Sequence, residues 1–73
     1  MAKEKDYDSL IALISSNIKK LRMKKGLTQE DMVEHGFNYR HYQRLESGSY
    51  SPSLSTLHRL ALVFKVKVSD LLK

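Results

Sequence analysis

The chain has 73 residues, 13 of them Lys or Arg against 8 Asp or Glu, which gives a formal net charge of +5 and no cysteine. This length supports one small hydrophobic core and leaves no room for a separate catalytic domain. The lack of cysteine excludes disulfides and thiolate chemistry, and no apolar run approaches the roughly 20 residues of a membrane-spanning helix. A small basic domain favours a polyanionic partner, nucleic acid first, and we expect a cytoplasmic location.

The N-terminal half of the chain begins with a strong helical pattern. We expect one domain over residues 1–73, with residues 1–7 flexible and a first helix over residues 8–25. Asp8 suits its N-cap and Gly26 its end. Apolar residues recur at three- and four-residue steps along it, at Leu10, Leu13, Ile14, Ile18 and Leu21.

Two shorter helices follow. Thr28 can cap the second helix, in which Val33 is expected to point inward and which Gly36 ends. Asn38 can cap a third helix over residues 39–46. Two helices joined by a short turn that contains glycine are typical of a helix-turn-helix.

The remaining chain predicts two more helices. Ser53 caps a fourth helix over residues 54–64, with Leu54 on its core side, and a short fifth helix covers residues 69–72. The fold class is therefore all-α, with five short helices and a helix-turn-helix at about 28–47.

The third helix has two chemically different faces. At about 100° per residue, Tyr42 and Leu45 lie on a core side. The outward side carries an aromatic ring, an amide and two guanidinium groups, from Tyr39, Arg40, Gln43 and Arg44. Arg can bind both acceptors of guanine and Gln can pair with adenine in the major groove. A merely solvated face usually carries Lys and Glu, and because this one has neither at its centre, we favour base contact.

Three segments together resemble one family. They are "IKKLRMKKGLTQEDM", "YQRLESG" and "SPSLSTLHRLALVFKVKVSDLL", which cover roughly residues 16–72. In this order and spacing they resemble the phage-repressor (Xre-type) helix-turn-helix DNA-binding family. The resemblance implies a lambda-repressor-like DNA-binding domain.

The resemblance also implies roles for single residues. Gln29 would contact a DNA phosphate, and Arg22 and Glu46 would form an ion pair that ties the first helix to the third. A carboxylate near the core edge, such as Glu46, needs a partner in any case. The main base-contacting positions would be Tyr39, Arg40 and Arg44, with Gln43 beside them.

Hydroxyl, amide and imidazole groups around the third helix are candidates for the DNA backbone. The loop after that helix is rich in hydroxyl groups, which commonly bind phosphate. The full set of expected backbone contacts is Thr28, Gln29, Asn38, His41, Ser47, Ser49, Tyr50 and Ser51. We expect the basic run from Lys19 to Lys25 to act in part through long-range steering rather than direct contact.

The chain departs from the family pattern in the helix-turn-helix. The spacing from Gln29 to Glu46 is one residue shorter than usual, with the missing residue near positions 34–36, so the pose of the third helix stays open. Tyr42 stands where the family has an aliphatic residue, and Lys65 replaces a glycine after the fourth helix.

An apolar pair on the fourth helix suggests a partner surface. Leu62 and Val63 are predicted to face away from the core, and exposed apolar neighbours are typical of interfaces. We expect a homodimer interface formed by Leu62, Val63 and Val66. The alternative is an exposed leucine without a role.

Metal, cofactor and catalytic functions find no support. His35, His41 and His58 are scattered over different helices, without the spacing of a zinc site. We expect no metal, no cofactor, no small-molecule ligand and no enzymatic activity.

The sequence thus predicts a sequence-specific DNA-binding transcriptional regulator that acts as a homodimer on a pseudo-palindromic operator, with the third helix in the major groove. The alternative is a protein-interaction module on the same fold, such as an antitoxin or a transcription cofactor. Within the first class, a restriction–modification controller and a phage or mobile-element repressor both fit, and activation and repression stay open.

Overall fold

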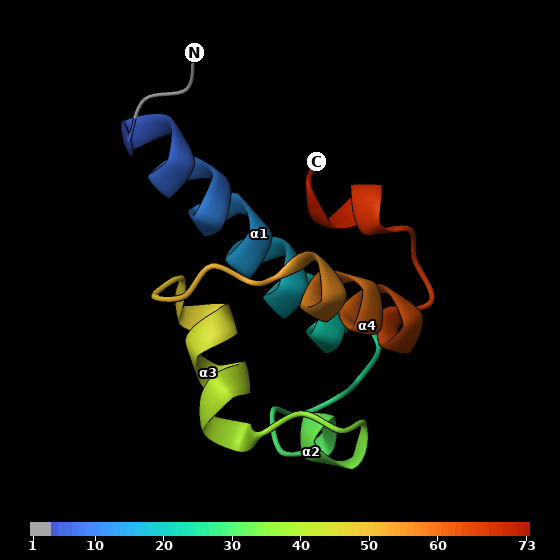
Figure 1. Cartoon of the computed structure of the whole chain (residues 1–73). Helices are drawn as coiled ribbons and strands as arrows, with labels where there is room; N and C mark the ends of the chain where they lie inside the picture. Colours follow the sequence, from blue (N-terminus) through green and yellow to red (C-terminus); the bar gives the residue numbers. More distant parts are fainter. Residues whose placement is uncertain (1–3) are drawn as a thin grey trace.

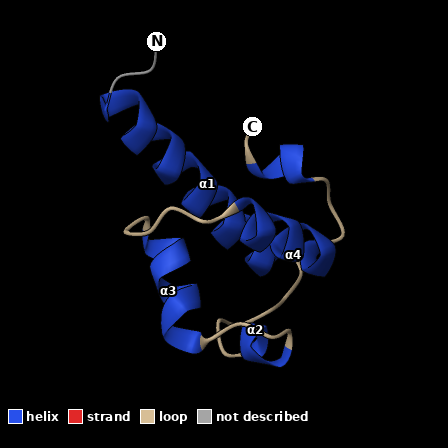
Figure 2. Ribbon diagram, viewed as in Figure 1, coloured by secondary structure: helices blue, strands red, loops and turns tan. Residues whose placement is uncertain are grey.

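The computed structural model describes residues 4–73, which form helices and loops and no strand (Figure 2). The elements are α1 (Glu4–Lys24), α2 (Asp31–Glu34), α3 (Tyr39–Ser47), α4 (Leu54–Phe64) and the 3-10 helix η1 (Val68–Leu71). The all-α prediction is confirmed. It differs in one detail, since the fifth element is a single 3-10 turn rather than an α-helix.

The long helix α1 crosses the molecule, and α3, α4 and η1 pack against its C-terminal half (Figure 1). The buried apolar side chains come from every helix and from the turn before α3. They are Ile14, Ile18, Met32, Phe37, Tyr42, Leu45, Leu57, Leu60, Ala61, Phe64 and Leu71. The Asn17 amide donates to the carbonyl of Leu71 at 2.9 Å, which holds η1 against α1.

Helix α1 begins earlier than predicted. It starts at Glu4, so Asp8 lies inside the helix and is not its N-cap. The Tyr7 hydroxyl donates to Ser51 Oγ at 2.6 Å, which ties this first part of α1 to the loop after α3. The flexibility expected for residues 1–7 falls in part on residues 1–3, which lie outside the described residues.

Two leucines expected in the core lie at its edge. Leu10 is 42% exposed and Leu13 is 37% exposed, because this half of α1 projects beyond the helices that cover its other half (Figure 1). Leu54 is also wrong as a core residue, at 75% exposure. It is the first residue of α4, one turn before the buried residues of that helix.

Helix α2 is short, and its N-cap is Glu30 without a side-chain cap bond, so Thr28 is not the N-cap as predicted. Thr28 instead bonds reciprocally with Asp31 across the turn that leads into the helix. The Thr28 hydroxyl accepts from the Asp31 amide at 3.1 Å, and Asp31 Oδ2 accepts from the Thr28 amide at 2.8 Å. The backbone amide and the hydroxyl of Thr28 hold the pKa of Asp31 below its usual value. Only Met32 is buried, whereas Val33, expected to point inward, is exposed, because four residues turn one side chain toward the core.

The caps of α3 and α4 agree with the sequence. Asn38 Oδ1 accepts from the His41 amide at 3.0 Å, and Ser53 Oγ accepts from the Thr56 amide at 3.1 Å. Lys65, after α4, has a φ of 58°, a left-handed conformation that glycine adopts at lower cost.

Candidate nucleic-acid interface

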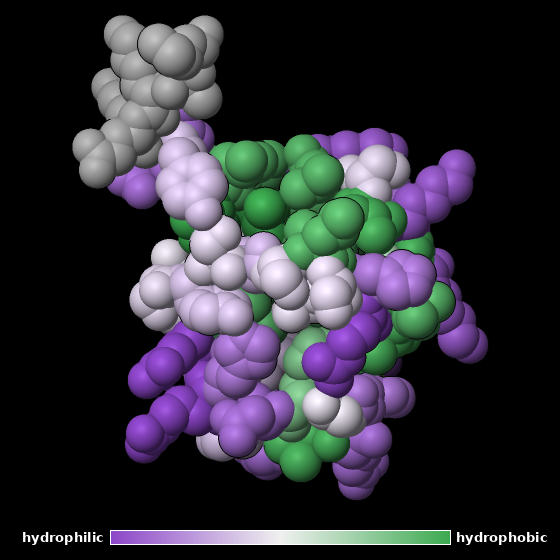
Figure 3. Space-filling model, viewed as in Figure 1, coloured by the Kyte–Doolittle hydropathy of each residue, from purple (hydrophilic) through white to green (hydrophobic). Residues whose placement is uncertain are grey.

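Helix α3 is held by one face and open on the other. Tyr42 and Leu45 are buried at 0% and 1% exposure, which orients the helix. The opposite face is exposed along its length and carries Tyr39, Arg40, Gln43 and Arg44. In the part of the chain that the structure describes, no hydrogen bond or ion pair occupies the side chains of these four residues. Strongly hydrophilic side chains gather at the lower left of the molecule, over α3 (Figure 3).

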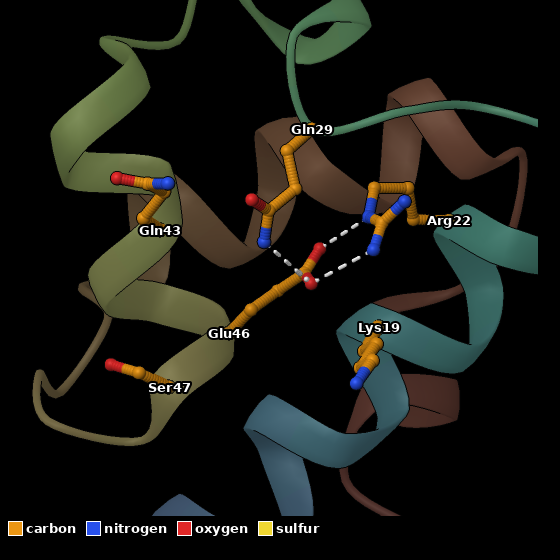
Figure 4. Close-up of a pocket in the computed structure, with 6 residues that line it drawn as sticks. All are labelled: Lys19, Arg22, Gln29, Gln43, Glu46 and Ser47. Atoms are coloured by element: carbon orange, nitrogen blue, oxygen red, sulfur yellow. Dashed lines mark hydrogen bonds and ion pairs between the residues drawn. The ribbon is translucent and has the colours of Figure 1, made fainter.

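An ion pair joins α1 to the C-terminal end of α3. Arg22 Nε and Nη2 donate to the two carboxylate oxygens of Glu46 at 2.5 and 3.1 Å. Gln29, just before α2, donates its amide to Glu46 Oε1 at 3.1 Å (Figure 4). A fourth bond, from Arg22 Nη1 to the carbonyl of Leu27 at 2.7 Å, extends the network to the turn after α1. The network therefore fixes α1, the turn that follows it and the C-terminal end of α3 relative to one another.

The network keeps its charges although it is nearly closed to solvent. The side chains of Arg22 and Glu46 are 11% and 4% exposed. Burial by itself would raise the pKa of Glu46, but the hydrogen bond from Arg22 and the smaller effects of Tyr42 and Gln29 hold it below its usual value. The same bond raises the pKa of Arg22. Both groups are thus charged at neutral pH, and the pair is bidentate, the strongest geometry for an arginine and a carboxylate.

Tyr42 brings a hydroxyl group to the edge of this network. Its side chain is fully buried, and its oxygen has no hydrogen-bond partner among the described residues. Burial, followed by the nearby carboxylate of Glu46, raises its pKa far above the usual value, so the phenol stays neutral. The Tyr42 hydroxyl helps to lower the pKa of Glu46, although the two groups do not form a hydrogen bond. The Tyr42 hydroxyl, which stands where the family has an aliphatic side chain, is therefore buried without a hydrogen-bond partner among the described residues.

The shortened turn before α3 is clamped by a residue that sequence reasoning missed. Arg59, on α4, donates from Nη2 to the carbonyl of Gly36 at 2.6 Å, and its guanidinium lies 4.4 Å from the centre of the Phe37 ring. Phe37 in turn packs edge-to-face on Tyr42, with ring centres 5.8 Å apart. The short turn marked this place as unusual, but nothing in the sequence pointed to an arginine 23 residues away.

The expected backbone-contacting residues lie on both sides of α3. The side-chain oxygen of Thr28 accepts from the Asp31 amide and that of Asn38 caps α3, while Gln29 uses its amide nitrogen on Glu46. Beyond the other end of α3, Ser47 and Ser49 share a hydrogen bond of 2.7 Å. Their contact with DNA stays a prediction.

His41 and Tyr50 form a small aromatic contact beside that loop. Their rings meet edge-to-face, with centres 4.7 Å apart, and Tyr50 remains 37% exposed. The neighbouring Ser51 is exposed and accepts the hydrogen bond from Tyr7 described above. The contact holds the loop against the first turn of α3, while the hydroxyl-bearing residues of the loop stay exposed.

The three residues expected at a dimer interface are not equally accessible. Leu62 is 65% exposed, whereas Val63 and Val66 are partly buried and pack against the core. Val63 does not face fully away from the core as predicted.

Residues 4–73 contain no helix that is long and apolar enough to cross a membrane. Among the side chains that the structure describes, no three from His, Cys, Asp or Glu lie close enough together to hold a metal ion.

Comparison with known proteins identifies the family. A family model described as helix-turn-helix matches residues 18–71. An uncharacterized HTH-type transcriptional regulator of Sinorhizobium fredii is 38% identical over 60 residues, 81% of this chain and 78% of that protein. Two such regulators of Archaeoglobus fulgidus are each 35% identical over 57 residues, 77% of this chain and 81% and 80% of their own lengths. No solved structure matches significantly. The chain therefore belongs to the Xre-type helix-turn-helix family, as its motifs indicated.

Proposed function

We propose that this protein is a sequence-specific DNA-binding transcriptional regulator that places α3 in the major groove. The observation that carries the proposal is the outward face of α3, where two arginines and a glutamine are exposed without partners in the described chain, on a helix fixed by its buried face. A recognition surface on a rigid helix loses less conformational entropy on binding than one on a mobile loop. Three relatives named as HTH-type transcriptional regulators support the proposal.

Base recognition is assigned to Tyr39, Arg40, Gln43 and Arg44. Arg40 and Arg44 are one turn apart on α3 and project from the same face, so they would reach neighbouring base pairs. The residues near the ends of α3 would bind phosphates and set the helix in the groove. The net charge of +5 supports an affinity that depends strongly on salt.

The experiment is selection of bound duplexes from a random DNA pool, followed by a salt titration of the selected sequence. We expect one enriched site, and Arg40→Ala and Arg44→Ala should each cost about 1–3 kcal/mol and relax the preference at one base pair. If the two variants lost equal affinity for the selected duplex and for random DNA, these arginines would bind only phosphates. An absence of enrichment, with a protein partner recovered instead, would favour the interaction-module alternative.

We further propose that the regulator acts as a homodimer in the cytoplasm. Leu62 supports the dimer, because it is a large, exposed apolar side chain in the last turn of α4. Two copies related by a two-fold axis would read a pseudo-palindromic site with half-sites about one helical turn apart. Sedimentation should detect dimers, and Leu62→Lys should shift them toward monomers. A monomer at high micromolar concentration, or an asymmetric selected site, would contradict the dimer.

A further inference from the structure

A cleft of about 450 Å³ separates α1 from α3, and it is lined by residues of both helices and by Gln29. The Arg22–Glu46 pair forms its interior. Lys19 stands on the α1 side, while Gln43 and Ser47 stand on the α3 side (Figure 4). The cleft is thus bounded on one side by the helix that carries the proposed base-reading face.

The charge in this cleft is unbalanced. Its lining contains two cations, Lys19 and Arg22, and one anion, Glu46. Glu46 accepts two hydrogen bonds from Arg22, so these two charges neutralise each other. The positive charge of Lys19 therefore has no counter-charge in the lining of the cleft. Lys19 is exposed, and no ion pair or hydrogen bond engages its ammonium group within the described residues. A polar cleft with one surplus positive charge is suited to a single anionic group.

A second free donor lies across the cleft from Lys19. Gln43 projects from α3, and its amide is likewise without a partner in the described chain. The hydroxyl of Ser47 is already bonded to the carbonyl of Arg44 at 3.0 Å, so it contributes less. An ammonium and an amide on opposite sides of a cleft can bind the same group of oxygen atoms, as a phosphodiester requires.

We propose that this cleft receives one phosphate of the DNA backbone and that Lys19 supplies the charge that binds it. The inference rests on the proposed function, since Gln43 also belongs to the outward face of α3, and a helix in the major groove lies between two phosphate backbones. It assigns a direct contact to one lysine of the basic run, part of which the sequence analysis assigned to long-range steering. Gln43 would then fix the position of the helix as well as lie near a base.

The test compares Lys19→Gln with Lys20→Gln on the duplex selected by the wild-type protein. Both lysines are exposed on α1, but only Lys19 lines the cleft, so Lys20 is a matched control for net charge. Affinity is measured across a series of salt concentrations. Lys19→Gln should lower the affinity and reduce the slope of log K against log salt by about 0.9 per protomer. Lys20→Gln should leave the slope near that of the wild type.

A second measurement locates the phosphate. Each backbone phosphate of the duplex is replaced in turn by a neutral methylphosphonate. At one position in each half-site, wild type and Lys19→Gln should bind with the same affinity, because the charge that Lys19 would contact is gone. Equal slopes for the two variants, or a Lys19→Gln deficit that persists at every position, would overturn the inference while leaving the regulator intact. A wild-type protein that binds no DNA in a salt-dependent way would refute both proposals together.

Discussion

The guanidinium of Arg59 lies 4.4 Å from the centre of the Phe37 ring, so that α4 holds the turn that leads into α3. The same guanidinium donates to the Gly36 carbonyl at 2.6 Å. Gly36 has a φ of 92°, and a Cβ at this position would come within 3.1 Å of Arg59 Nη2. The shortened turn therefore depends on a glycine at its bend and on an arginine above it. Both contacts act on the segment that sets the direction of α3.

Removal of the Arg59 side chain should loosen this turn. Arg59→Ala loses a cation–π contact and a hydrogen bond at a largely exposed site, and we expect the free energy of unfolding to fall by about 1 kcal/mol. Urea denaturation measures this change. His58→Ala is the matched control, because His58 is exposed next to Arg59 on α4. If both variants were equally stable, the clamp would have no energetic role.

Loss of Glu46 should have the largest effect on stability. In Glu46→Ala, Arg22 stays mostly buried without its partner, and we expect a loss of about 3–5 kcal/mol. Thermal denaturation followed by circular dichroism measures it. Glu34→Ala removes an exposed carboxylate from α2 and should change stability little. Similar losses for the two variants would contradict a special role for the Arg22–Glu46 pair.

The same pair predicts how stability depends on pH. Because the folded protein holds the pKa of Glu46 below its unfolded value of about 4.3, the pair stabilises the fold above that pH. This contribution is lost as the pH falls through the lowered folded pKa, when the carboxylate takes up a proton. Glu46→Gln cannot titrate, so the stability difference between wild type and variant should shrink between about pH 5 and pH 3. A difference that stays constant over this range would show that Glu46 does not carry it.

Tyr42→Phe should be tolerated. The substitution keeps the ring that packs on Phe37 and removes a buried hydroxyl without a hydrogen-bond partner among the described residues. We expect stability to be unchanged or to rise by up to about 1 kcal/mol. Chemical denaturation at neutral pH measures the difference, with Tyr39→Phe as an exposed control on the same helix. A clear loss of stability would place the hydroxyl in a hydrogen bond with Glu46.

Lys65→Gly should stabilise the protein. Lys65 has a φ of 58° and ψ of 46°, a left-handed conformation that costs a non-glycine residue about 1–2 kcal/mol. Glycine removes this cost but adds freedom to the unfolded chain, so we expect a net gain of about 0.5–1 kcal/mol in unfolding free energy. Lys67→Gly is the matched control, because Lys67 has an ordinary φ of −85° and should only lose stability. Equal losses in both variants would mean that Lys65 is not strained.

Local chemistry determined most of the fold. The apolar spacing of α1 and α4, the caps at Asn38 and Ser53, and the glycines that end helices are all short-range features. The sequence therefore predicted the bounds of α3 and α4 closely, and the end of α1. The core and outer sides of α3 also follow from its 100° periodicity. Arg22 and Glu46 were paired only through the family resemblance, and the structure places them in contact.

Only the tertiary structure decided which parts of each helix are covered by other helices and which stay exposed to solvent. Leu54 and Leu10 carry the right periodicity for a core, yet they are exposed because no neighbour reaches them. In the same way, the clamp of Arg59 on the turn and the cleft beside Lys19 depend on helices that are distant in sequence meeting at a particular angle. Periodicity defines the side of a helix that can be buried, whereas burial itself depends on the long-range packing of the other helices.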